Sequence, residues 1–361
     1  MSAGIHELLG SVGTALGAEG LPNAIELPPA RGYVVLVVDG MGESLLREHE
    51  RLAPWLNGLA SVDGVESAIP STTSVSLTSL GTGLRPGVHG MAGYSCRVPG
   101  TRQILNTLSW NADVDPREWQ PHRAMPARLR DDGIAVTVVN ESRFADSGLT
   151  LCSQRDVPFI GVDRPWERLE AVVEASQGPH RTFVYAYEGR LDHTGHGKGV
   201  DSPEWRDMLT TIDGEIAELR SELPSDVVLL VTADHGMIDL PADGRFDVED
   251  HPELLEGVQL LAGEARFRHL YTSTGAEAEV ARRWRDRLGD RAIVLEREEA
   301  AERWFGPLDP AVRGRFGDVV VASLGDFAVF SSRHFRIELG LRGFHGSITP
   351  AETRIPVLLS N

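Results

Sequence analysis

Carboxylate and imidazole side chains occur at metal-ligand spacing in three parts of the sequence. Asp192 and His196 are four residues apart, Asp234 and His235 are adjacent, and Asp39 directly follows an apolar run. A carboxylate and an imidazole within one turn of chain can bind one ion at ~2.0–2.2 Å. The spacing therefore predicts a divalent-metal site, although Asp39 taken alone is more typical of a turn or a helix N-cap.

A cluster of hydroxyls and a late histidine could add to this chemistry. Residues 70–76 run Pro-Ser-Thr-Thr-Ser-Val-Ser, with Thr73 at the centre. Hydroxyls at a helix start are ordinarily caps, and a threonine is a poor nucleophile at neutral pH unless a metal or a base activates it. His345 lies in the sequence Gly-Phe-His-Gly, which fits either close approach to a ligand or a solvated loop.

Short apolar runs precede several of these residues and predict the strands that position them. The runs cover residues 33–38, 135–139, 182–187 and 227–232 and are rich in Val, Tyr and Leu. Helical patterns at 44–59, 166–175 and 205–223 alternate with them. This alternation predicts an α/β fold with a mostly parallel central sheet flanked by helices. Ligand sites in such folds lie at the carboxyl ends of the strands, where the candidate residues are expected.

The pattern changes in the later part of the chain. Residues 255–335 contain several candidate antiparallel strands, the last at 327–331, and one helical pattern at 277–288. We interpret residues 255–335 as an inserted α+β cap. Residues 1–254 and 336–361 then form the catalytic core, to which a final strand at 355–359 returns.

Composition excludes several classes of function. The chain has 361 residues with 53 acidic and 35 basic side chains, for a net charge of −18. Such a surface repels phosphate backbones, so nucleic-acid polymers and anionic membranes are not expected partners. Two cysteines cannot supply a disulfide framework or a cysteine-based zinc site. The apolar runs are too short to span a bilayer, and no signal peptide is visible, so we expect a cytoplasmic protein.

Five sequence blocks resemble a known family. They are V-V-D-G-M-G at 37–42, P-S-T-T-S-V-S-L-T-S-L-G-T-G-L-R-P-G-V-H-G at 70–90, D-H-T-G-H-G at 192–197, T-A-D-H-G-M at 232–237 and G-F-H-G at 343–346. In this order they resemble the type I phosphodiesterase and nucleotide pyrophosphatase branch of the alkaline phosphatase superfamily. The resemblance implies an alkaline-phosphatase-like sheet with two divalent metal ions at its carboxyl edge, Zn²⁺ in the family and Mn²⁺ as an alternative.

The resemblance also implies roles for individual residues. One ion would be held by Asp39, Thr73, Asp234 and His235, and the other by Asp192, His196 and His345. Thr73 would be the nucleophile, attacking phosphorus in a small phosphorylated substrate to give a phospho-threonine intermediate that water then hydrolyses. Ser76, one helical turn after Thr73, is a candidate substrate contact through its hydroxyl.

Alternatives within and outside the superfamily stay open at this point. A phosphomonoesterase, a phosphonate hydrolase or a manganese-dependent phosphomutase would use the same Asp and His ligands. A non-catalytic protein that keeps metal for stability is the alternative from another class. The natural substrate and the oligomeric state do not follow from these residues.

Overall fold

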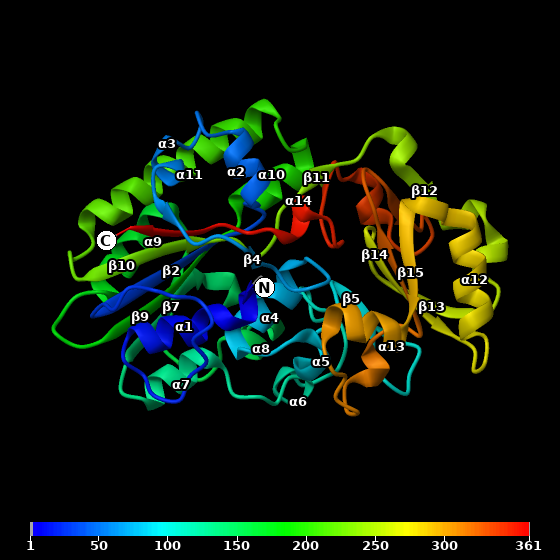
Figure 1. Ribbon diagram of the computed structural model, residues 1–361, viewed down its shortest axis with the longest axis horizontal. Helices are drawn as coiled ribbons and strands as arrows, with labels where there is room; N and C mark the ends of the chain where they lie inside the picture. Colours follow the sequence, from blue (N-terminus) through cyan, green and yellow to red (C-terminus); the bar gives the residue numbers. More distant parts are fainter. Residues whose placement is uncertain (1–2, 361) are drawn as a thin grey trace.

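The computed structural model describes residues 3–360 and has an α/β architecture with a large central sheet (Figure 1). This sheet has seven strands in the order β3-β19-β10-β2-β9-β7-β8. Five neighbours, β10, β2, β9, β7 and β8, run parallel, and β19 is antiparallel to both of its partners. The strands span β2 (Gly32–Val38), β3 (Ala60–Ser61), β7 (Ala135–Glu141), β8 (Phe159–Val162), β9 (Thr182–Glu188), β10 (Val227–Thr232) and β19 (Val357–Ser360).

Every residue of β2, β9 and β10 is buried, as expected for inner strands of a parallel sheet that helices cover on both faces. In Figure 1 helices α2, α3 and α11 lie above the sheet, and α1, α7 and α8 lie below it. The α-helices up to residue 222 are α1 (Leu8–Ala15), α2 (Glu43–Glu48), α3 (Pro54–Asn57), α4 (Thr73–Thr82), α5 (Pro86–His89), α6 (Pro116–Trp119), α7 (Met125–Asp131), α8 (Gly148–Ser153), α9 (Pro165–Ala175), α10 (Arg190–Lys198) and α11 (Pro203–Glu222).

The single helix predicted over residues 44–59 is wrong, because the chain forms α2 and α3 separately. Pro54 is the reason. A proline disfavours helical backbone at the residue before it, and Ala53 has φ −129° and ψ 60°. Pro54 itself occupies the first turn of α3, where its missing N–H costs nothing.

A second sheet lies to the right of the first in Figure 1, with α12 (Glu277–Leu288) at its outer side. It is antiparallel throughout, in the order β13-β14-β16-β15. Its strands are β13 (Val258–Glu264), β14 (Phe267–Thr272), β15 (Ala292–Glu296) and β16 (Val319–Ser323). Trp284 of α12 is fully buried and belongs to a separate hydrophobic cluster formed by this helix and the second sheet.

Residues 327–331 do not join the antiparallel sheet, contrary to the prediction. β17 (Ala328–Phe330) pairs in parallel with β12 (Arg245–Asp247), which precedes the proposed cap. Phe246 and Val248 also belong to the hydrophobic cluster of the second sheet. The boundaries proposed at 255 and 335 therefore stay a prediction, and we use "inserted unit" for the segment from β13 to β17.

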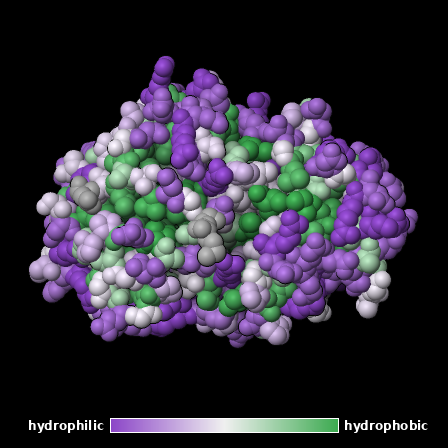
Figure 2. Space-filling model, viewed as in Figure 1, coloured by the Kyte–Doolittle hydropathy of each residue, from purple (hydrophilic) through white to green (hydrophobic). Residues whose placement is uncertain are grey.

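Several shorter elements complete the two parts of the chain. They include β5 (Ser95–Arg97), β6 (Ile104–Asn106), β11 (Ile238–Asp239), α13 (Arg297–Ala300), β18 (Gly343–Phe344) and α14 (Pro350–Thr353). On the face shown in Figure 2, hydrophilic residues dominate the periphery and hydrophobic residues gather toward the middle. None of the helices within residues 3–360 is long and apolar enough to cross a membrane.

Candidate active site

The most deeply buried part of the site lies where β2 and β10 end. Asp39 follows β2, and Asp234 and His235 follow β10. The two strands are parallel neighbours, with Val37 opposite Thr232, so their carboxyl ends meet. The His235 Nε2 atom lies 3.3 Å from Asp39 Oδ1 and 3.6 Å from Asp234 Oδ2. We call Asp39, Asp234 and His235 the buried cluster.

Two glycines permit this close approach of backbone segments. Gly40 has φ 73°, and its N–H donates to Asp234 Oδ1 at 3.3 Å. A Cβ atom on Gly236 would lie 2.0 Å from the carbonyl oxygen of Ala351. A side chain at position 40 would press against Asp192 of α10, and one at position 236 would collide with the backbone of α14.

Thr73 is the first residue of α4, and its hydroxyl points at the buried cluster. The Oγ1 atom lies 3.2 Å from His235 Nε2. Thr72 before it is extended and acts as the N-cap residue of the helix. Because the N–H groups of the first turn of a helix have no partners within the helix, this position also suits binding of an anion.

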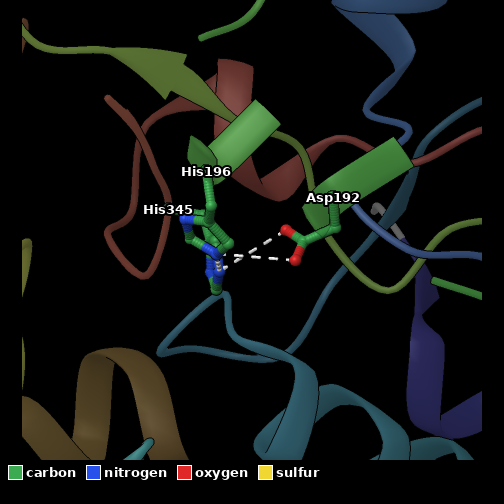
Figure 3. Close-up of side chains that lie close together, drawn as sticks. All are labelled: Asp192, His196 and His345. Carbon is green, nitrogen blue, oxygen red and sulfur yellow. Dashed lines mark hydrogen bonds and ion pairs between the residues drawn. The ribbon is translucent and has the colours of Figure 1, made fainter. Parts of the chain in front are cut away.

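A second group of candidate ligands lies toward the rim of the same site. Asp192 and His196 are one turn apart on α10 and point toward His345, which follows β18 (Figure 3). The His196 Nε2 atom lies 3.5 Å from Asp192 Oδ2 and 3.2 Å from His345 Nε2. The His345 Nε2 atom is 3.8 Å from Asp192 Oδ1. We call Asp192, His196 and His345 the rim cluster.

All three histidines present Nε2 to the site, since Nδ1 of each is hydrogen-bonded to a backbone carbonyl. The acceptors for His196, His235 and His345 are the carbonyls of Gly343, Gly236 and Ser71, at 2.8, 3.0 and 3.0 Å. A carbonyl partner requires a proton on Nδ1 and leaves the Nε2 lone pair free for a metal. Burial, with the neighbouring histidines, holds the pKa of His345 well below its ordinary value, so its ring is neutral. The rings of His235 and His345 stack at 3.7 Å and join the two clusters.

The carboxylates of the site carry more negative charge than their surroundings balance. Burial raises the pKa of Asp39 well above its ordinary value, and the charges of Asp192 and Asp234 add to this. Burial likewise raises the pKa of Asp234. Within residues 3–360, the buried atoms Asp39 Oδ1, Asp192 Oδ1 and Asp234 Oδ2 have no hydrogen-bond partner.

These unpartnered oxygens and free Nε2 atoms are the donor set that a divalent cation requires. In each cluster the ligand atoms lie within 4.8 Å of one another. Oxygen and imidazole donors fit Zn²⁺ or Mn²⁺, and the donor set alone does not decide between them. The structure thus brings together all seven residues proposed as ligands, Thr73 included.

A cavity of about 1180 Å³ opens over both clusters. Thr73, Asp39, Asp192, His196 and His345 line it. Its other walls come from several elements and are largely apolar, with Leu77, Leu108, Phe144, Phe335, Ile337 and Phe344 among the lining residues. The volume exceeds what a phosphoryl group fills, so a substrate with a sizeable second substituent fits this cavity.

The structure does not bring Ser76 to this cavity. Its side chain is completely buried in α4, it is not among the lining residues, and its hydroxyl has no hydrogen-bond partner within the described chain. A contact between Ser76 and substrate stays a prediction that this geometry does not support. The neighbouring residue Leu77 lines the cavity instead.

Three further residues around the site escaped the sequence patterns. Tyr187 donates a hydrogen bond from its hydroxyl to Asp39 Oδ2 and thereby holds that ligand. Glu188, which is 2% exposed, accepts hydrogen bonds from Arg168 and Arg190 at the entry to α10. Glu264 of the inserted unit lines the cavity. Tyr187 is the last residue of a predicted strand and Glu188 follows it, which was a usable signal, whereas no motif surrounds Glu264.

Comparison with known families supports the arrangement. The model of the family "Type I phosphodiesterase / nucleotide pyrophosphatase" matches residues 33–348. The chain belongs to this family. Family membership supports hydrolysis of phosphodiester or pyrophosphate bonds, and the family implies divalent metal ions.

Solved structures show the same fold. Murine ectonucleotide pyrophosphatase/phosphodiesterase 5 has a TM-score of 0.72 at 19% identity, covering 91% of this chain and 87% of that one. An inactive threonine-to-alanine variant of the murine protein, in complex with AMP, has a TM-score of 0.71 at 18% identity with the same coverage. The human protein has a TM-score of 0.71 at 15% identity, again with 91% and 87% covered. No curated protein matches the sequence significantly.

Proposed function

We propose that the chain is a metal-dependent hydrolase that cleaves a phosphodiester or pyrophosphate bond in a small nucleotide, with Thr73 as the nucleophile. The observation that carries this proposal is the position of the Thr73 hydroxyl. It lies at the start of α4, 3.2 Å from His235 Nε2, and faces a cavity lined by Asp39 of the buried cluster and by all three residues of the rim cluster. The AMP complex of the murine structural neighbour supports a nucleotide as the substrate class.

The two clusters would each hold one divalent ion. The buried cluster with Thr73 would hold one, and the rim cluster the other. When bound, such ions stabilise the negative charge on the attacking, leaving and phosphoryl oxygens. The alternative, a metal bound for stability alone, fits less well because structural sites are closed, whereas Asp39, Thr73 and the whole rim cluster line a cavity here.

The residues of the chain then divide the work of the reaction. Thr73 loses its hydroxyl proton to solvent, Oγ1 forms a bond to phosphorus as the bond to the leaving oxygen breaks, and the leaving oxygen takes up a proton from solvent, which gives a phospho-threonine intermediate. Water hydrolyses this ester in a second step and regenerates the threonine. The free N–H groups at the start of α4 bind the phosphoryl oxygens, and Tyr187 keeps Asp39 in place.

A mass-spectrometric trap of the intermediate tests this assignment. The zinc-loaded protein is mixed briefly with a nucleotide diester, quenched in acid and digested. We expect the mass of the retained phosphoryl moiety on the peptide that carries Thr73, and neither this adduct nor turnover in Thr73→Ala. The matched control is Thr78→Ala in the same helix, where the buried hydroxyl donates only to the Ser74 carbonyl. An adduct on another residue, or turnover by Thr73→Ala, would refute the nucleophile assignment.

The location of the protein remains a proposal as well. We propose a cytoplasmic enzyme acting on a soluble nucleotide.

A further inference from the structure

The inserted unit supplies one wall of the cavity and presents a buried carboxyl group there. Glu264, the last residue of β13, is 8% exposed and lines the same cavity as Thr73. Its Oε2 atom accepts a hydrogen bond from the backbone N–H of Tyr94 at 2.8 Å. Its Oε1 atom is buried and has no hydrogen-bond partner in the described part of the chain. Half of this carboxyl group is therefore engaged, and the other half is free.

Glu264 lies between the turn that carries the rim residue His345 and the backbone at residues 93–94. Gly346, next to His345, has φ 119°, and a Cβ atom there would lie 2.5 Å from Glu264 Cγ. On the other side Glu264 contacts Tyr94, and the carbonyl of the preceding residue, Gly93, accepts a hydrogen bond from Ser74 Oγ at 3.2 Å. Ser74 directly follows Thr73 in the chain. The carboxyl thus lies in the cavity wall beside the turn that carries His345.

No cation neutralises this carboxyl group in the described chain. The nearby Arg268 is committed to Glu338, with which it forms a buried ion pair, and to the Val329 carbonyl at 2.9 Å. Burial raises the pKa of Glu264 to about 8, although the Tyr94 N–H and the Arg268 charge both lower it. A neutral carboxylic acid has one O–H donor, which the Tyr94 contact does not use.

We propose that Glu264 is a substrate-contacting residue whose carboxylic acid donates a hydrogen bond from Oε1 to an anionic phosphoryl oxygen of the substrate. This inference rests on the proposed function, because that function supplies the anion. A carboxylate at this place would repel a phosphoryl group, whereas a neutral acid binds it. The inserted unit then takes part in substrate binding and does more than cover the site.

The test compares two near-isosteric variants with p-nitrophenyl phosphodiester as the substrate. Glu264→Gln keeps a donor for the substrate and an acceptor for Tyr94, whereas Glu264→Leu keeps neither. We expect Gln to retain kcat/KM close to the wild-type value and Leu to lose about 10- to 100-fold, mainly through KM. A Leu variant with wild-type kcat/KM, or a Gln variant as impaired as Leu, would overturn the proposal.

A pH profile gives a second test that does not depend on the folding of the Leu variant. Above pH 8 the wild-type acid ionises, loses its donor and repels the substrate, so KM rises, whereas KM of Glu264→Gln stays flat. The charged groups that also face Glu264 are Arg268 on β14, Glu338 before β18 and Glu352 on α14, and all three are unchanged in the variant. Parallel profiles for the two proteins would contradict the proposal.

Binding of AMP, measured by calorimetry, separates this inference from the proposed function. If the wild type hydrolyses the diester and Glu264→Leu binds AMP equally well, the inference fails and the function stands. If the wild type hydrolyses no diester, the function fails, and weaker AMP binding by Leu than by Gln still supports the contact. Asp213→Asn is the control. Its buried carboxylate accepts from the Trp55 and Leu56 N–H groups outside the cavity, so we expect wild-type AMP affinity.

Discussion

The two ligand clusters differ in what holds them. Asp39 and His235 of the buried cluster extend from the ends of adjacent parallel strands, and the side chains are 5% and 0% exposed. The rim cluster joins one turn of α10 to a segment about 150 residues later, and the His196 side chain is 25% exposed. The buried cluster is thus part of the sheet, whereas the rim cluster depends on where a loop is anchored. Removing a ligand from each should therefore have different consequences for the fold.

Substituting one ligand of each cluster should abolish most of the activity in both cases. We expect Asp234→Asn and His196→Asn each to lower kcat/KM for a diester by about 10³-fold, because several kcal/mol of charge stabilisation are lost. Zinc content, measured after gel filtration, should fall by one ion per chain in each variant. Retention of both ions by either variant would contradict the assignment of that residue.

The same two variants should differ in the stability of the metal-free protein. Asp234 is fully buried with an unpartnered oxygen, and its raised pKa means that the ionised form destabilises the fold above the ordinary carboxyl pKa. We expect Asp234→Asn to stabilise the chelator-treated protein by about 1–3 kcal/mol, while His196→Asn changes its stability little. Denaturant unfolding in chelator measures this difference. Destabilisation of the metal-free protein by Asp234→Asn would show that another group already balances this charge.

A smaller and selective effect should follow from loosening the loop that carries His345. Arg266 of the inserted unit forms a fully buried, bidentate ion pair with Glu352 at 2.7 Å. Glu352 Oε1 also accepts the Ser347 N–H at 2.9 Å. Arg266→Met leaves Glu352 buried and unpaired, which should cost about 3–5 kcal/mol of stability.

The loosened loop should weaken metal binding at the rim cluster more than at the buried cluster. In a competition titration we expect Arg266→Met to bind zinc more weakly at the rim cluster and to retain the ion at the buried cluster. Replacing Glu352 by Gln in the same chain removes the unpaired charge, keeps an acceptor for the Ser347 N–H and should restore part of the stability. Equal weakening of both ions would mean that the loop does not distinguish the clusters.

The contrast between the clusters also explains what the sequence could predict. Asp39 and Asp234 follow apolar runs, so a parallel sheet alone places them together, and the spacing of Asp192 and His196 fits one helical turn. The tie between Arg266 and Glu352 joins positions 86 residues apart, and no local pattern marks it. The position of Glu264 in the site could not be predicted for the same reason, because β13 contacts the Tyr94 backbone only in the folded chain. Ser76 shows the converse. The family resemblance suggested a contact with substrate, but α4 directs this side chain into the core.

The most direct test of the account is hydrolysis of a p-nitrophenyl phosphodiester beside the matching monoester, with and without chelator. The account predicts that the wild type prefers the diester, loses activity in chelator and regains it with added Zn²⁺ or Mn²⁺, while Thr73→Ala remains inactive throughout. Monoester preference would place the chain among the phosphomonoesterases instead. Diester hydrolysis that persists in chelator, or in Thr73→Ala, would contradict the proposal that metal ions at the buried and rim clusters, together with Thr73, catalyse the reaction.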